Sequence, residues 1–154
     1  MFSKILVCMD GSKLAEQVLP FATEIAQAFR SRLIFFTALP EPVIVAPGIP
    51  GVAPAHVHTD AMVADAIKGQ AEAETYLDRL VAQAMDKGIK AEKMVMTGLP
   101  GPTIIEFAER SGIGLIAIAT HGRGGVERAV MGSVADYLLR RSQVPVFVVR
   151  PKKA

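Results

Sequence analysis

The sequence has no tryptophan, a single cysteine and only three histidines among its 154 residues. One thiol cannot build a disulfide framework, so the chain must fold without such cross-links, which suits a reducing compartment. Cys8 lies within the apolar run Ile5–Met9, where a cysteine is typical of a small core residue. A chain of this length buries about 70% of its unfolded surface, so it needs no disulfide or metal to be stable.

An excess of charge of one sign is also absent, because 17 basic and 15 acidic residues leave a formal net charge of +2. Nucleic-acid-binding proteins concentrate Lys and Arg on one face, but here only Arg140–Arg141 and Lys152–Lys153 cluster. No apolar run approaches the ~18 residues that span a bilayer, and the opening Met1–Lys4 does not resemble a signal peptide. We therefore expect a cytoplasmic protein that binds neither nucleic acid nor membrane.

Five short β-type runs alternate with helical patterns along the chain. Most are continuous apolar blocks, which indicate strands covered on both faces, as in a parallel sheet. The predicted strands are Lys4–Met9, Leu33–Thr37, Lys90–Met96, Gly114–Ala119 and Val144–Arg150. The alternation predicts one α/β domain over residues 1–154. Its fold would be a three-layer sandwich with a five-stranded, parallel, doubly wound, Rossmann-like sheet and helices on both faces.

Apolar periodicity and end signals define four helices between these strands. The first begins after Ser12, a good N-cap, and continues to Phe29 with a bend at Pro20. The others run from Ala61 to Lys87, from Pro102 to Gly112, and from Ser133 to the residues before Pro145.

The connection Leu39–Asp60 is much longer than the others and holds five of the ten prolines. Loops of this length are usually functional or disordered. It leaves the carboxyl end of the second predicted strand, which is the edge where open α/β sheets bind ligands. Two interpretations stay open: a floppy insertion, or a lid over a bound ligand.

The segment Ala119–Ser133 carries the clearest chemical signal. Three glycines fall within Gly122–Gly125, and glycine lets a backbone approach a ligand closely. Gly132 and Ser133 then open a helix whose first N–H groups and dipole favour an anion, and Arg123 adds positive charge. We predict that this segment cradles the phosphates of a nucleotide. The alternative is that the glycines only shape a strand-to-helix turn and that Ser133 is an N-cap.

Two common phosphate motifs do not describe this segment. The sequence has no G-x-x-x-x-G-K-[ST], so the segment is not a P-loop. A dinucleotide fingerprint would follow the first strand, with an acid about 20 residues further on. Here the glycines follow the fourth predicted strand, and no acid lies at that distance.

The order of elements and the spacing of the glycines resemble the universal stress protein family. The resemblance is carried by Gly122, nine residues, Gly132-Ser133 and the closing run Val144–Arg150, together with the opening run Ile5–Ser12. It covers essentially the whole chain. It implies the fold of that family, an adenine nucleotide alpha hydrolase-like form of the doubly wound sheet.

The resemblance also implies roles for individual residues. Gly122, Gly132 and Ser133 match the motif G-x-x-G-x9-G-[ST] with which ATP-binding members hold phosphates, and the Val134 amide lies close by. Asp10 matches an acid that contacts the nucleoside.

Three alanines complete the comparison with that motif. Ala38 matches a position whose backbone contacts adenine. Ala119 stands in the site where the motif has its first glycine, and Ala135 stands where some members carry a hydroxyl residue.

By this resemblance the protein would be an ATP-binding regulatory protein of the stress response, with Mg or Mn on the phosphates and slow or no hydrolysis. Two alternatives stay open: a dimeric interaction module that binds no nucleotide, and a weak ATP phosphohydrolase. The predicted last strand Val144–Arg150 is a long apolar edge that invites pairing, and the family commonly dimerises there. We therefore expect a homodimer through this strand.

No catalytic or metal site is predicted. His121 has no obvious partner, and the pair His56 and His58 lacks the third and fourth ligands that a zinc site needs. The sequence also offers no paired carboxylates and no Ser-His-Asp order that would mark an efficient hydrolase.

Overall fold

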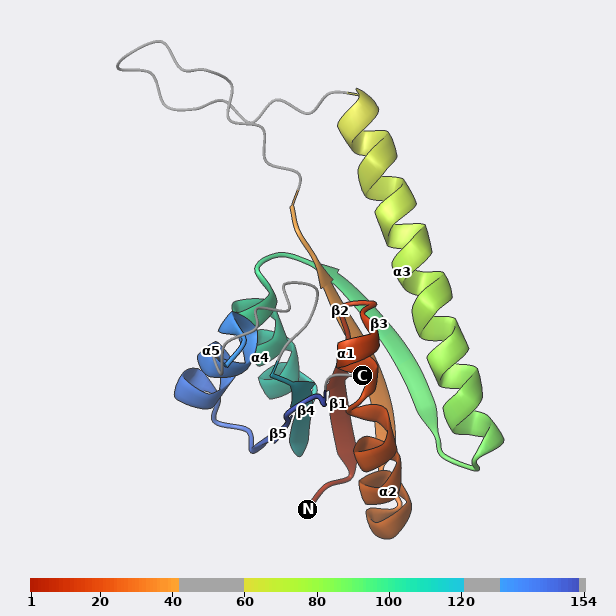
Figure 1. Cartoon of the computed structure of the whole chain (residues 1–154), viewed down its shortest axis with the longest axis vertical. Helices are drawn as coiled ribbons and strands as arrows, with labels where there is room; N and C mark the ends of the chain where they lie inside the picture. The colour runs from red at the N-terminus through yellow and green to blue at the C-terminus, as the bar shows by residue number, and fades with distance from the viewer. Residues whose placement is uncertain (42–59, 121–130, 153–154) are drawn as a thin grey trace.

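The structure is a computed structural model that describes residues 1–41, 60–120 and 131–152 (Figure 1). Within these residues the sheet has five parallel strands in the order β3-β2-β1-β4-β5. The strands are β1 (Lys4–Cys8), β2 (Arg32–Leu39), β3 (Ala91–Thr97), β4 (Leu115–Ala119) and β5 (Val146–Val149). The chain builds outward from β1 to β3 and then returns to the other side of β1, so the strand order reverses between β1 and β4.

Helices cover both faces of the sheet (Figure 1). On one face, α1 (Lys13–Glu16), α2 (Leu19–Phe29) and α3 (Asp60–Asp86) bury strand residues such as Val7 and Phe35. On the other face, α4 (Pro100–Arg110) and α5 (Ser133–Arg141) bury residues such as Cys8 and Ile116. Each strand therefore contributes apolar side chains to two separate cores, which is why its sequence is a continuous apolar block. The predicted three-layer, doubly wound α/β fold is confirmed.

The region after Ser12 differs from the sequence prediction. A single bent helix was expected, but α1 ends at Glu16 and α2 begins at Leu19. Pro20 is thus the second residue of α2, where its missing N–H removes no helical bond and its fixed φ suits the first turn. The prediction of one helix was wrong because the apolar periodicity continues across the break.

Several boundaries also differ by a few residues. β2 continues to Leu39, because Ala38 and Leu39 still pair with Met96 and Thr97 of β3. α4 begins at Pro100, two residues before the predicted start at Pro102. β5 is the four-residue core of the predicted last strand. Of the predicted long connection Leu39–Asp60, the two ends belong to β2 and α3, and residues 42–59 lie outside the described residues.

The helix α3 is longer than the sheet beneath it. Its 27 residues span about 40 Å, whereas the seven residues of β3 span about 23 Å. Its buried residues are Leu77, Leu80 and Ala84, all in its second half. Figure 1 shows that the first half extends beyond the sheet, and Ile67 there is 65% exposed.

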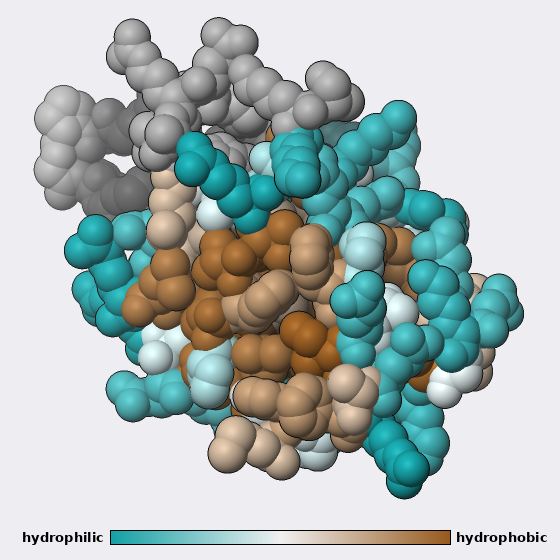
Figure 2. Space-filling view, turned by 60° about the horizontal axis from the view of Figure 1, so that its bottom comes forward, coloured by the Kyte–Doolittle hydropathy of each residue, from teal (hydrophilic) through white to brown (hydrophobic). Residues whose placement is uncertain are grey.

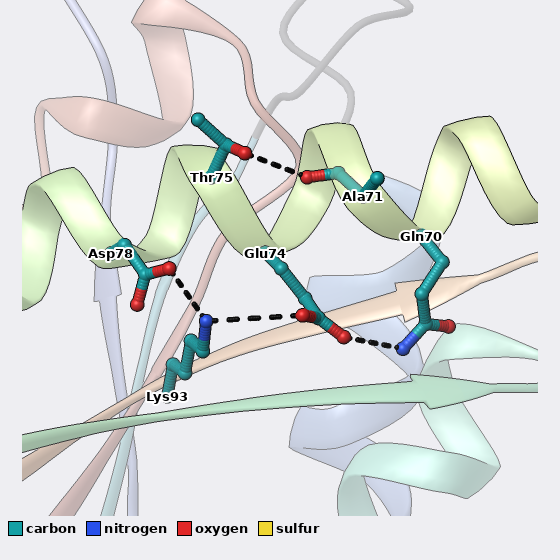
Figure 3. Close-up of polar contacts among 6 residues, drawn as sticks. All are labelled: Gln70, Ala71, Glu74, Thr75, Asp78 and Lys93. Carbon is teal, nitrogen blue, oxygen red and sulfur yellow. Dashed lines mark hydrogen bonds and ion pairs between the residues drawn. The ribbon is translucent and has the colours of Figure 1, made fainter.

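Charged side chains fasten the second half of α3 to β3 (Figure 3). The Lys93 Nζ lies 2.6 Å from a carboxylate oxygen of Asp78 and 3.9 Å from one of Glu74. The Gln70 side-chain amide donates to the other oxygen of Glu74. These contacts cover the outer strand of the sheet with polar groups.

A close contact between α4 and α5 holds α5 in place. A Cβ added at Gly101 would come within 2.5 Å of the Tyr137 ring. Glycine is therefore needed in the first turn of α4, because it lets the two helices touch there. This packing orients α5, whose N-terminus points to the carboxyl edge of the sheet.

Candidate functional site

The carboxyl ends of β1, β2 and β4 bring predicted site residues to one level of the sheet. Cys8 of β1 pairs with Phe36 of β2. Asp10 and Ala38, each two residues further along the chain, therefore lie side by side. Val7 pairs with Ala117, which places Asp10 level with Thr120. The strand order reverses between β1 and β4. In open α/β sheets such a switch point is where ligands bind.

Asp10 is held in a tight turn that starts α1. Its Oδ1 accepts a hydrogen bond of 2.9 Å from the Ser12 N–H, and Gly11 between them adopts a φ of 79°, which favours glycine. The Ser12 hydroxyl in turn accepts from the Ala15 N–H at 3.1 Å and caps α1. An ionised carboxylate accepts several hydrogen bonds at once, so the Ser12 contact fixes its direction without saturating it.

The start of α5 lies beside the end of β4. The Gly132 N–H donates to the Thr120 carbonyl at 2.5 Å, and the Gly132 carbonyl accepts from the Asp136 N–H at 2.9 Å. Gly132 is the N-cap, and no side chain caps the helix. Ser133 is therefore the first helical residue, and the interpretation of Ser133 as an N-cap is wrong. The amides of Ser133, Val134 and Ala135 form the first turn, whose N–H groups have no partner within the helix.

The side chains of the two alanines that depart from the family motif both point into the interior of the fold. Ala119 is 7% exposed, and strand alternation puts its methyl on the same face as Ala117, the face covered by α1 and α2. α5 covers the opposite face. Ala135 is 1% exposed and packs with Leu138 in the core. A hydroxyl at position 135 would therefore point into the apolar core in this arrangement.

Other predicted residues lie outside the described residues. These are Gly122 and Arg123 of the predicted phosphate loop, and the three histidines. Within residues 1–41, 60–120 and 131–152, no three His, Cys, Asp or Glu side chains are grouped as a metal site would require. None of the helices in these ranges is long and apolar enough to cross a membrane.

Sequence reasoning missed two residues that support the site. The buried Thr37 hydroxyl donates to the Met9 carbonyl at 3.0 Å and fixes the backbone just before Asp10. Thr120 is also buried, and its N–H and carbonyl connect β5 to the start of α5, through Val149 and Gly132. A threonine at the end of an otherwise apolar run was the only local signal for either.

A sequence model described as the universal stress protein family matches residues 1–150. The chain belongs to this family. Universal stress protein YxiE of Bacillus subtilis is 28% identical over 150 residues, which are 97% of this chain and all of YxiE. The resemblance inferred from Gly122, Gly132 and Ser133 is thus confirmed at the level of the family.

Solved structures share the fold of this universal stress protein. The structure of MJ0577, a universal stress protein of Methanocaldococcus jannaschii, has a TM-score of 0.81 at 23% identity and covers 100% of this chain and 99% of that one. A universal stress protein in complex with cAMP has a TM-score of 0.67 at 22% identity and covers 97% of each chain. An Arabidopsis thaliana family protein with AMP bound scores 0.68 at 14% identity, covering 97% and 92%.

Proposed function

We propose that this universal stress protein binds an adenine nucleotide, ATP in the first place, at the switch point between β1 and β4. It would act as a regulatory protein of the stress response, with hydrolysis slow or absent. The proposal rests on one observation. Asp10, Ala38 and the start of α5, which no side chain caps, lie next to one another at the carboxyl edge of the sheet.

The start of α5 supplies the chemistry for the phosphates. The first-turn amides of Ser133, Val134 and Ala135 and the positive end of the helix dipole favour an anion. The Ser133 hydroxyl adds a donor, and Gly122 and Arg123 would complete the cradle from the preceding segment. A Mg or Mn ion would be held by the phosphate oxygens and would neutralise part of their charge.

The nucleoside would lie toward β1 and β2. The Asp10 carboxylate, at the end of β1, can accept hydrogen bonds from ribose hydroxyls, and the Ala38 backbone lies at the same level for the adenine edge. The cAMP and AMP in the two related structures support an adenine nucleotide as the ligand class. The motif favours ATP over AMP, because it includes both the start of α5 and Gly122. A chain of several phosphates would lie between these two places.

Calorimetry with ATP, AMP and cAMP in the presence of magnesium tests the proposal. The Gly132 backbone, with φ −58° and ψ 145°, suits any residue, so Gly132→Val adds bulk at the helix start without backbone strain and should abolish ATP binding. Ser133→Ala should weaken it about 10- to 100-fold, because a hydrogen bond to a charged group is worth ~1.5–3 kcal/mol. Ser111→Ala, at the C-terminal end of α4, is the matched control and should change nothing.

The absence of any heat with millimolar ATP, AMP and cAMP would contradict nucleotide binding and favour a pure interaction module. Mass spectrometry of small molecules released from natively purified protein would identify the nucleotide that is carried. A turnover above about one per second would indicate a true phosphohydrolase instead.

The apolar edge at β5 supports a homodimer through the C-terminal strand Val144–Arg150. Figure 2 shows apolar side chains gathered in the middle of one face of the molecule. Phe21 of α2 is 47% exposed and lies against Phe147 of β5, with ring centroids 6.1 Å apart. Val146 and Val148 are only partly buried. Pairing of this edge with a second copy would bury these side chains and satisfy the unpaired strand backbone.

A further inference from the structure

The short helix α1 directly follows Asp10 and is held by contacts from distant parts of the chain. It has four residues, too few to be stable on its own. Only Ala15 of these four is buried in the core. Ala15 and the fully buried Val18, which follows α1, fix its core side. Its outer side is held by polar contacts that Glu16 and the C-cap residue Gln17 make with α3 and with the segment after β5.

The segment after β5 is attached to α1 by a reciprocal pair of hydrogen bonds. The Gln17 Nε2 donates to the Lys152 carbonyl at 2.8 Å, and the Lys152 N–H donates to the Gln17 Oε1 at 2.8 Å. The two residues are 135 positions apart in the sequence. A glutamine amide can satisfy a backbone donor and a backbone acceptor together, which neither a carboxylate nor an apolar side chain can do.

The helix α3 holds the neighbouring residue. The Arg79 Nη2 lies 2.7 Å from the Glu16 Oε1, and the Arg79 guanidinium lies over the Tyr76 ring, 5.2 Å from its centroid. Burial raises the pKa of the Tyr76 phenol, and the nearby Glu16 carboxylate raises it further. Glu16 and Gln17 thus connect α1 to α3 and to the segment after β5 respectively.

These contacts reach Asp10 through Ser12. The Ser12 N–H holds the Asp10 carboxylate, and the Ser12 hydroxyl holds the first turn of α1 through the Ala15 N–H. Any shift of α1 therefore moves the donor that orients Asp10. We propose that Gln17 is a positioning residue of the nucleotide site, which holds α1 against Lys152 and thereby aims the Asp10 carboxylate at the nucleoside. This inference rests on the proposed function.

The test compares Gln17→Leu with Gln83→Leu, a glutamine on the exposed surface of α3. Each full-length variant is titrated with ATP, with adenosine and with inorganic tripolyphosphate. Because Asp10 would contact the nucleoside and not the phosphates, Gln17→Leu should weaken ATP and adenosine by the same factor, about three- to tenfold. Tripolyphosphate, held at the start of α5, should bind as in the wild type. Gln83→Leu should match the wild type with all three ligands.

A second readout follows the attachment itself. Amide hydrogen exchange at Lys152 should be accelerated about tenfold or more in Gln17→Leu, whereas exchange in the core strands should not change. Gln17→Glu keeps the acceptor for the Lys152 N–H and loses the donor, so it should restore part of the protection and part of the adenosine affinity.

Two results would overturn the inference alone. One is faster exchange at Lys152 with unchanged affinity for adenosine and ATP. The other is an equal loss of affinity for tripolyphosphate, which would indicate general loosening of the site. A wild-type chain that binds none of the three ligands would instead contradict the proposed function, and the inference with it.

Discussion

The two outer strands of the sheet are built in opposite ways. β3 pairs with β2 along its whole length. It carries the charged residues Glu92 and Lys93 on its two faces, which form ion pairs with Arg32 of β2 and with acidic residues of α3 respectively. β5 has only four residues, all apolar, and lies beside the exposed Phe21. Charges on an outer strand oppose pairing with another chain, whereas an apolar edge invites it. This difference agrees with the proposed homodimer, which would form at β5 and not at β3.

The largest effect should follow from a charge at the β5 edge. Phe147→Asp places a carboxylate in the proposed interface twice, once in each copy of a symmetric dimer. Burial of an unpaired charge is costly, so we expect the dimer dissociation constant to rise at least about a thousandfold. Light scattering at micromolar concentration should then report a monomer.

The control for this variant lies on the opposite edge. Glu92→Lys changes the charge of an exposed β3 residue and breaks its pair with Arg32, but the molecular mass in solution should not change. A wild-type chain that is monomeric at micromolar concentration would contradict the proposed homodimer. Circular dichroism must show that Phe147→Asp is folded.

The next effect concerns what holds α3 on the β3 side. Leu80 is fully enclosed between α3 and the sheet, so Leu80→Ala should lower the free energy of unfolding by about 3 kcal/mol through lost burial and a cavity. Denaturant titration measures this change. A loss below about 1 kcal/mol would show that the core beneath α3 closes around the missing atoms.

A smaller effect is expected from the ion pairs on the same strand. Lys93 is about one-third exposed and Asp78 nearly two-thirds exposed, so Lys93→Ala should cost only about 0.5–1 kcal/mol of stability. The difference from wild type should shrink in 1 M salt, where the screening length falls to about 3 Å. A loss as large as that of Leu80→Ala would mean that the charges, and not the core, hold the helix.

The smallest effect should come from the half of α3 that extends beyond the sheet. Ile67 is largely exposed in the described structure, and Ile67→Lys should change the free energy of unfolding by less than about 0.5 kcal/mol. The same denaturant titration applies. A destabilisation above about 1.5 kcal/mol would show that this side chain is buried in solution.

Sequence patterns predicted the layers of this fold because each strand and helix is marked by residues within its own segment. Apolar blocks indicate strands whose two faces are both covered by helices, and Gly88 and Pro145 each indicate that a helix has ended. The break before Pro20 could not be seen, because Val18 and Ala22 are both buried and the apolar spacing runs across it. Proline is compatible with either a bent helix or a new first turn, and only tertiary packing decides between them.

The candidate site likewise has parts that could be predicted from the sequence and contacts that could not. The start of α5 could be predicted because Gly132 and Ser133 precede a helical pattern, whereas the role of Asp10 came from the resemblance to the family. The bond between Thr37 and Met9 and the pair between Gln17 and Lys152 join residues 28 and 135 positions apart. No pattern within one segment contains such contacts. The ionic contacts of Lys93 were equally invisible, because they depend on which face of α3 meets β3.

The buried cysteine can report how often the central strand becomes exposed to solvent. Cys8 lies on β1 beneath α4 and α5, and burial raises the pKa of its thiol to about 12. At neutral pH the thiol is therefore protonated and shielded, and alkylating reagents attack only the thiolate. Labelling can occur only when the central strand is uncovered, so the rate of modification at this one atom measures how often the middle of the sheet comes apart.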